Sequence, residues 1–160
     1  MKYISRNSSG VFEMRAYEDY LEGESESFLS HVTGANLLAI ERFVPTGPES
    51  FHDARFESLL ASTLLAKSTD SEIGALRVDL RLKGPYFDRH FELQYEDVAS
   101  CKLEAPGPAD DLLMHEVRSE NGFVIHDFEF DKGKTISIVS RRIRFIERLE
   151  CSAEASGSEK

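Results

Sequence analysis

The hydrophobic and polar positions between residues 111 and 146 predict three consecutive antiparallel strands. The runs Leu112–Arg118 and Phe123–Phe130 flank an Asn121-Gly122 dipeptide. Asn-Gly between alternating runs favours a tight hairpin, because both residues tolerate a positive φ. A two-residue type I′ turn and a type I turn followed by a Gly bulge both fit. In either register one face is more apolar than the other, and we assign it to the core. That face collects Leu113, His115, Val117, Val124, His126, Phe128 and Phe130.

The second turn of this unit is expected at residues 131–133, where Gly occupies the position that requires a left-handed backbone. A three-residue loop there places Ile136 opposite Phe128 and Ile138 opposite His126, which extends the same apolar face. Beyond Ile138 the apolar positions change from even to odd numbers. We therefore expect a β-bulge between Val139 and Arg141 that restores the inward direction.

Further alternating segments precede this unit. Ala75–Lys83, Phe87–Tyr95 and Val98–Leu103 each predict a strand. The inward positions are expected to be Leu76, Val78, Leu80 and Leu82, followed by Phe87, Phe91, Leu93 and Tyr95. The segment 49–67 is ambiguous, because its apolar residues fit both a helix face and an alternating strand.

The N-terminal third of the chain predicts helices. Val11–Gly23 has apolar residues at helical spacing, and Asn36 is suited to cap a second helix that runs to about Phe43. A strand over Leu37–Val44 is the alternative for the second segment. Pro45-Thr46-Gly47-Pro48 then forms the clearest boundary in the chain.

Together these patterns predict an α+β fold. We expect an antiparallel β-meander of about six or seven strands, forming a strongly bent sheet, with one or two N-terminal helices covering one face. A single domain is expected over residues 1–150, with a helical region at 1–48 and the sheet at 49–150. Residues 151–160 are polar and are expected to form a disordered tail.

Composition and charge narrow the class of protein. The 160 residues carry a net charge of −10, which argues against nucleic-acid binding but is compatible with a protein partner that has a basic surface. The segment from Glu13 to Glu26 is the most acidic part of the chain. Cys101 and Cys151 form neither a disulfide framework nor a metal-ligand spacing. No signal peptide or apolar run of membrane-spanning length is visible, so we expect a cytoplasmic protein without cofactor and without membrane contact.

One stretch resembles a known group of proteins. Phe51-His52-Asp53-Ala54-Arg55-Phe56-Glu57-Ser58-Leu59 is similar to the His-Asp-Ala…Ser-Leu opening of a loose group of small bacterial β-rich proteins. The resemblance covers Phe51 to Ile146 and leaves residues 1–48 outside it. Some members are grouped with immunity proteins of bacterial toxin systems. The resemblance implies that Arg55–Ala66 is a strand, and it carries over no catalytic residues.

The histidines are the first candidate site. His115 and His126 share a face on neighbouring strands, which places them within about 5–8 Å of each other. His52 and Asp53 approach them if the first strand lies beside this hairpin. Imidazoles with a carboxylate can bind Zn²⁺, although no recognised zinc spacing is present. The alternative, which we favour, is a set of neutral histidines in the core.

A second candidate is polar. Asp88, His90 and Glu92 follow the outer face of one predicted strand, and Arg77, Asp79 and Arg81 are expected opposite them. Such a face can be a binding surface or a solvated set of cross-strand ion pairs. A basic set on the last strand can bind an anion or pair internally with the acidic segment; it comprises Arg141, Arg142, Arg144 and Arg148.

Three functions follow from these observations. The first is a non-enzymatic protein-binding or immunity-type protein. The second is a metal-dependent or small-ligand enzyme centred on His52, His115 and His126. The third is a structural homo-oligomer, in which an edge strand such as Val98–Leu103 pairs with a second copy of the chain.

Overall fold

A computed structural model describes residues 1–33, 50–67, 72–108 and 110–150. Its elements are β1 (Ser5–Arg6), β2 (Phe12–Glu13), α1 (Arg15–Leu29), β3 (Val32–Thr33), β4 (Arg55–Lys67), β5 (Glu72–Lys83), β6 (Arg89–Glu96), β7 (Ser100–Leu103), β8 (Leu112–Glu120), β9 (Phe123–Phe130), the 3-10 turn Asp131–Gly133, β10 (Lys134–Ser140) and β11 (Arg142–Leu149). The expected second helix or strand after Asn36, the boundary at Pro45–Pro48 and the tail 151–160 lie outside the described residues.

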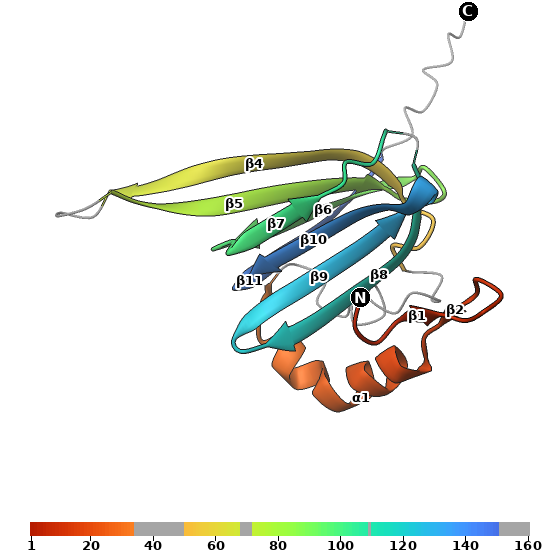
Figure 1. The fold of residues 1–160 in the computed structure, drawn as a ribbon. Helices are drawn as coiled ribbons and strands as arrows, with labels where there is room; N and C mark the ends of the chain where they lie inside the picture. Colours follow the sequence, from red (N-terminus) through yellow and green to blue (C-terminus); the bar gives the residue numbers. More distant parts are fainter. Residues whose placement is uncertain (34–49, 68–71, 109, 151–160) are drawn as a thin grey trace, which may run out of the picture.

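The strands form three sheets. β1 and β2 form a small sheet, β7-β10-β9-β8 a four-stranded sheet, and β3-β11-β6-β5-β4 a five-stranded sheet (Figure 1). The pairing is antiparallel except between β3 and β11. The α+β class is therefore as predicted, but the single bent meander of six or seven strands is wrong.

The chain passes between the two larger sheets at two places. Between β6 and β7 it crosses from the five-stranded to the four-stranded sheet, and at Arg141 it crosses back between β10 and β11. The two crossings are hydrogen-bonded to each other: the Arg141 N–H donates to the Glu96 carbonyl (3.2 Å) and the Ala99 N–H to the Val139 carbonyl (2.8 Å). The predicted change of parity near Val139 is real, but its cause is a change of sheet rather than a bulge within one strand.

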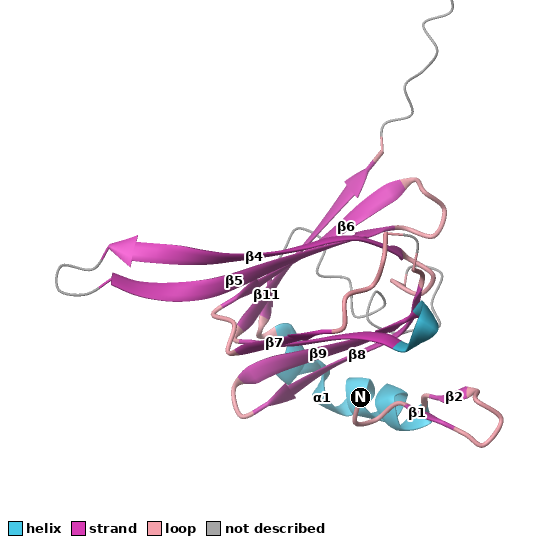
Figure 2. Ribbon diagram, turned by 45° about the horizontal axis from the view of Figure 1, so that its top comes forward, coloured by secondary structure: helices cyan, strands magenta, loops and turns pink. Residues whose placement is uncertain are grey.

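The core lies between the two larger sheets, which form separate layers in Figure 2. Phe56 from one sheet meets Phe130 from the other, with ring centroids 5.8 Å apart. At one end the sheets are joined by the bridge between Arg55 and Asp111. Burying this apolar surface between two layers is the main source of stability in such a fold.

The hairpin registers were predicted well. Ile136 pairs with Phe128 and Ile138 with His126, as expected. Asn121 (φ 52°) and Gly122 (φ 76°) both have a left-handed backbone, so the two-residue turn is the one that forms. Leu113 is a wrong core assignment: a bulge between residues 112 and 114 turns Leu112 inward instead.

The earlier strands also agree with the alternation, with one exception. β4 is a strand, which settles the ambiguity of segment 49–67. In β5 the side chains of Val78, Leu80 and Leu82 are completely buried. Phe87 was expected to point inward, but it lies in the loop before β6 with φ 58° and an exposed ring. The loop that begins at Gly84-Pro85 therefore extends further than the sequence pattern indicated.

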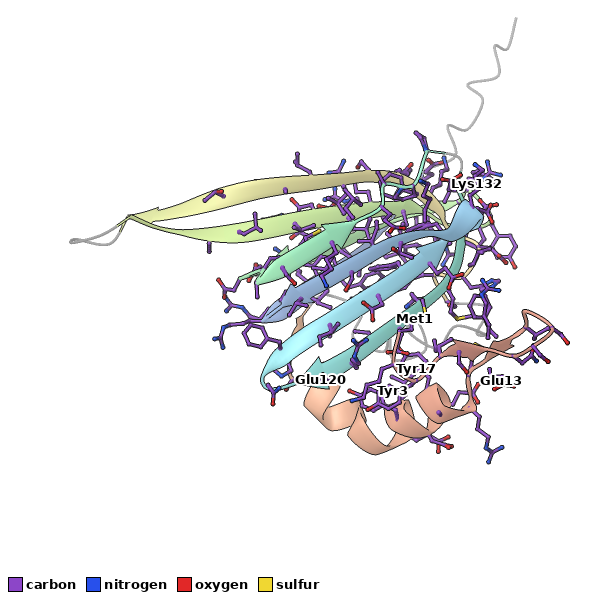
Figure 3. The ribbon with its side chains drawn as sticks, viewed as in Figure 1. Met1, Tyr3, Glu13, Tyr17, Glu120 and Lys132 are labelled. Carbon is purple, nitrogen blue, oxygen red and sulfur yellow. The ribbon has the colours of Figure 1, made fainter. Side chains whose placement is uncertain are left out.

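The helix α1 lies along an edge of a sheet rather than over the centre of a face. The Tyr17 hydroxyl accepts a hydrogen bond from the Val117 N–H (2.8 Å), and the Tyr20 hydroxyl accepts one from the Ser119 N–H (2.7 Å). Figure 3 shows Tyr17 between the helix and the strands. The two tyrosines thus satisfy outward-pointing donors of edge strand β8, which protects that edge from pairing with other chains.

The N-terminal segment covers the outer side of the four-stranded sheet through a buried carboxylate. Glu116 is fully buried and accepts hydrogen bonds from the backbone N–H groups of Lys2, Tyr3 and Ile4 at 2.7–3.0 Å. Arg118 adds a further bond to the same side chain at 2.9 Å. Such full satisfaction is what allows a carboxylate to be buried.

None of the helices among the described residues is both long enough and apolar enough to span a membrane.

Candidate functional site

Two groups of candidate residues lie on opposite sides of the five-stranded sheet, and His52 and Asp53 lie apart from both in the loop before β4. His115 and His126 point into the core between the sheets, whereas His90 and Glu92 lie on the face turned away from the four-stranded sheet. We call this second surface the outer face. Only the outer face reaches solvent, because His115 and His126 are completely buried.

The two core histidines form a hydrogen-bonded chain with a tyrosine. The Tyr95 hydroxyl lies 2.8 Å from His126 Nδ1, and His126 Nε2 lies 3.3 Å from His115 Nδ1. A neutral imidazole has one donor and one acceptor nitrogen. Donation from Tyr95 to His126, and then from His126 to His115, therefore fits two neutral rings.

Burial keeps these rings uncharged. Desolvation, with a smaller contribution from His52, lowers the pKa of His115 to about 3. Burial and then the neighbouring His115 and Arg118 lower the pKa of His126 well below its usual value. The favoured prediction of neutral core histidines agrees with this environment.

His52 and Asp53 stay at the periphery. His52 Nδ1 lies 2.9 Å from the Asp53 carboxylate; the Asp53 side chain is exposed and His52 is half-buried. Across the ranges that the structure describes, no group of three or more His, Cys, Asp or Glu side chains is arranged to bind a metal ion. The sequence pattern thus placed His115 beside His126 correctly, but the structure does not add His52 and Asp53 to them as a ligand set.

Asp79 and Arg81 lie opposite outer-face residues of β6, as the sequence predicted, whereas Arg77 lies beyond that pairing and pairs with Ser62 of β4. Arg81 pairs with Glu92, Asp79 with Gln94, and Lys83 with His90. Asp88 lies at the end of this row and binds the adjacent Arg89 guanidinium at 2.7 and 2.9 Å. The basic strand β11 completes the surface, since its Arg144 pairs with Gln94.

A pocket of about 320 Å³ opens on this face. It is lined by Glu57, Arg81, His90, Phe91, Glu92 and Arg148. His90 and Glu92 were sequence candidates, and Arg148 belonged to the predicted basic set. Glu57 was missed, since a side chain from β4 joins the pocket only through the pairing of β4 with β5.

Glu92 forms the floor of the pocket and draws two arginines together. Its Oε1 accepts a hydrogen bond from Gln94 at 2.6 Å, and its Oε2 lies 3.9 Å from Arg81 and 3.6 Å from Arg148. The Glu92 side chain is 10% exposed, against 58% for Arg81 and 68% for Arg148. The acidic group is therefore covered, and the two guanidinium groups face solvent.

His90 lies between two carboxylates at the side of the pocket. Its Nδ1 is 2.8 Å from Glu57 and its Nε2 is 2.6 Å from Glu150. The hydrogen bond to Glu57, followed by that to Glu150, raises the pKa of His90. This favours the charged imidazolium, which makes His90 unlike the two core histidines.

Exposed apolar side chains lie at the end of the five-stranded sheet, where β11 meets the β5–β6 loop, and they were not predicted as a site. Tyr86 is 74% exposed, and Phe87 follows it in the β5–β6 loop. Leu149, at the end of β11, is 70% exposed and pairs with Arg89, on the face opposite to that of Arg148. The Glu150 N–H donates to the Asp88 carbonyl at 2.8 Å, which holds the end of β11 against this loop. We call Tyr86, Phe87 and Leu149 the apolar rim. Only the pairing of β11 with β6 brings Leu149 there, so no local signal in the sequence identifies it.

The basic set on β11 does not pair with the acidic N-terminal segment as far as the described residues show. Arg142 binds Glu96 (3.3 Å) and Asp97 (3.1 Å), and Arg148 lies beside Glu92. The internal pairing that the sequence suggested is therefore made with β6 and the residue after it.

The predicted edge strand Val98–Leu103 is observed as β7, at one edge of the four-stranded sheet. Its Leu103 is exposed. Pairing with a second copy of the chain stays a prediction.

No family model, no curated protein and no solved structure matches this chain. The fold class, mainly antiparallel α+β, and the geometry of the outer face are therefore the basis for a functional proposal.

Proposed function

We propose that this protein is a non-enzymatic binding protein that recognises a partner protein through the outer face of its five-stranded sheet. The observation that supports this is a charged pocket with two exposed arginines on the outer face, together with the apolar rim at the adjoining end of the same sheet. Protein interfaces are enriched in exposed aromatic residues and arginine, which carry most of the binding energy.

The apolar rim has the features of a preformed contact. The Phe87 ring has the Arg55 guanidinium 4.7 Å and the Lys83 ammonium 5.6 Å from its centroid. Such cation–π contacts hold the ring in place while it stays exposed. A side chain that is already ordered loses less entropy when a partner binds.

The core histidines offer less support for an enzyme. His115 and His126 are completely buried, and neither lines the outer-face pocket. A catalytic group has to come within hydrogen-bond distance of its substrate. The structure gives these histidines a packing environment instead, so the enzyme hypothesis remains the weaker alternative.

A toxin is one class of partner that the proposal includes. The resemblance of residues 51–146 to a group that contains immunity proteins leads us to expect a partner made by the same cell. The apolar rim would then contact the toxin directly.

The proposal is tested by affinity capture from a lysate of the source organism. The immobilised wild-type protein is compared with a Tyr86→Ser/Leu149→Ser variant and with a Leu103→Ser control on the other large sheet. Truncation of an interface anchor weakens binding by about 2 kcal/mol, which is about 30-fold.

We expect a partner that the wild type and the Leu103→Ser control retain equally and that the rim variant loses. Equal retention by all three proteins, or capture of no protein by the wild type, would refute the proposed function. Circular dichroism of each variant verifies that the fold is intact.

A further inference from the structure

We propose that Arg81 and Arg148 form a binding site for a carboxylate, and that its occupant is an aspartate or glutamate side chain of the partner protein. This inference rests on the proposed function and names the chemistry of the pocket. The sequence predicted a basic partner surface from the net charge of −10. The exposed arginines of this pocket indicate instead an acidic group on the partner.

Positive charge is in excess at the floor of the pocket. Two guanidinium groups approach the same Glu92 Oε2 atom, at 3.9 and 3.6 Å. One carboxylate neutralises only one of them, and its other oxygen is occupied by Gln94 at 2.6 Å. Glu57 also lines the pocket, but it is paired with His90 at 2.8 Å, so Arg81 and Arg148 share one carboxylate and one positive charge is left over.

The guanidinium N–H donors of Arg81 and Arg148 are not used in hydrogen bonds among the described residues. Within the described parts of the chain, neither Arg81 nor Arg148 donates a hydrogen bond to a protein group, and both distances to Glu92 exceed hydrogen-bond length. Arg89 on the same sheet is different, because it donates to Asp88 and to Glu147 at 2.7–2.9 Å. Arg81 and Arg148 are therefore held in place electrostatically with their donors available.

The positions of Arg81 and Arg148 fit a single carboxylate between them. Arg81 is on β5 and Arg148 on β11, so they extend from the two sides of β6 and converge on one oxygen. Guanidinium groups bind carboxylates through paired N–H donors, and this geometry is stronger and more specific than a point charge. A carboxylate above Glu92 can accept from both arginines.

The surroundings of the pocket select a side chain of a protein over a free ion. The apolar rim lies at the end of the same sheet, one residue beyond the pocket residue Arg148 on β11, and offers contact area to a polypeptide but nothing to a small anion. A basic side chain fits poorly, because it would meet two exposed guanidinium groups before it reached Glu92, which is 10% exposed.

The test is a titration of the isotope-labelled protein with N-acetyl-glutamate N-methylamide, followed by backbone amide and arginine Nε–H signals. The glutamine analogue serves as the uncharged control. Arg81→Gln and Arg148→Gln are the test variants, and Arg144→Gln is the matched control, since Arg144 is an exposed arginine of β11 that does not line the pocket.

We expect saturable shifts of the signals of residues 81, 92 and 148, with a dissociation constant on the order of 1 mM. Both test variants should weaken this binding at least tenfold, whereas Arg144→Gln should leave it unchanged. Absence of saturation at about 0.1 M ligand, equal shifts with the glutamine analogue, or equal weakening by the control variant would overturn the inference.

Two further outcomes separate this inference from the proposed function. Tighter binding of succinate or phosphate than of a glutamate-containing peptide would show a site for free anions and overturn the assigned occupant. A partner that is lost by the rim variant but retained by Arg81→Gln and Arg148→Gln would overturn the carboxylate site and leave the protein-binding function standing.

Discussion

The buried histidine pair predicts a loss of stability in weak acid, well before the carboxylates titrate. His115 and His126 are neutral in the folded protein because burial lowers both pKa values, that of His115 to about 3. In the unfolded chain their pKa is about 6.5, so the unfolded state binds more protons below that pH. The stabilising effect is therefore complete above pH 6.5 and is lost progressively as the pH falls.

The magnitude follows from the linkage between proton binding and folding. Each pKa unit corresponds to about 1.4 kcal/mol, so the titration of His115 alone lowers the free energy of unfolding by about 2 kcal/mol between pH 7 and pH 5. If His126 contributes equally, the total is about 4 kcal/mol. This loss is a large part of the free energy of unfolding of a typical folded domain, which is about 5–15 kcal/mol.

The assay is urea unfolding, followed by circular dichroism at pH 7, 6 and 5. His115→Leu removes one of the two titrating groups, so the change in the free energy of unfolding between pH 7 and pH 5 should fall to about half. His90→Gln is the control. Glu57 and Glu150 raise the pKa of His90, so its contribution has the opposite sign: it is present in acid and lost as the pH rises. Equal stability at pH 7 and pH 5, or an unchanged pH dependence in His115→Leu, would refute the reasoning.

Three further substitutions test the packing. Glu116→Gln should lower the free energy of unfolding by about 2–4 kcal/mol in chemical denaturation, because an amide cannot accept from the Lys2–Ile4 backbone and from Arg118 together; a loss below about 0.5 kcal/mol would contradict this. Tyr17→Phe should cost about 1–2 kcal/mol in the same assay, since it leaves the buried Val117 N–H without its acceptor. Gly122→Ala, at φ 76°, should lower the melting temperature through about 1 kcal/mol of backbone strain, and an unchanged melting temperature would argue against the type I′ turn.

Local chemistry explains why the hairpins were predictable. Asn121 and Gly122 determine the turn, and the turn determines the register of β8 with β9, so the neighbourhood of His115 and His126 follows. The common outer face of Asp79, Arg81, His90 and Glu92 follows from alternation in the same way, whereas their pairing depends on the β5–β6 loop. These features depend on residues that are close in sequence, and the pattern alone was sufficient.

Features that depend on distant residues were not predictable. Glu116 reads as a solvent-facing residue by alternation, and only the docking of Lys2–Ile4 makes it a buried acceptor. The crossing at Arg141 reads as a bulge, because a change of sheet and a bulge alter parity identically along one strand. Leu149 joins the apolar rim only through the pairing of β11 with β6, which lie far apart in the chain. Glu57 reaches the pocket only through the pairing of β4 with β5 and its hydrogen bond to His90 of β6.

The central claim, that the outer face and the adjoining apolar rim form the binding surface, is tested most directly by photo-crosslinking in the cells that make the protein. A photoreactive p-benzoylphenylalanine replaces Tyr86 in the apolar rim in one variant and the exposed Asp19 of α1 in another. The account predicts a specific crosslinked product from position 86 and none from position 19. A product from position 19 alone would place the partner on the acidic helix and contradict the account.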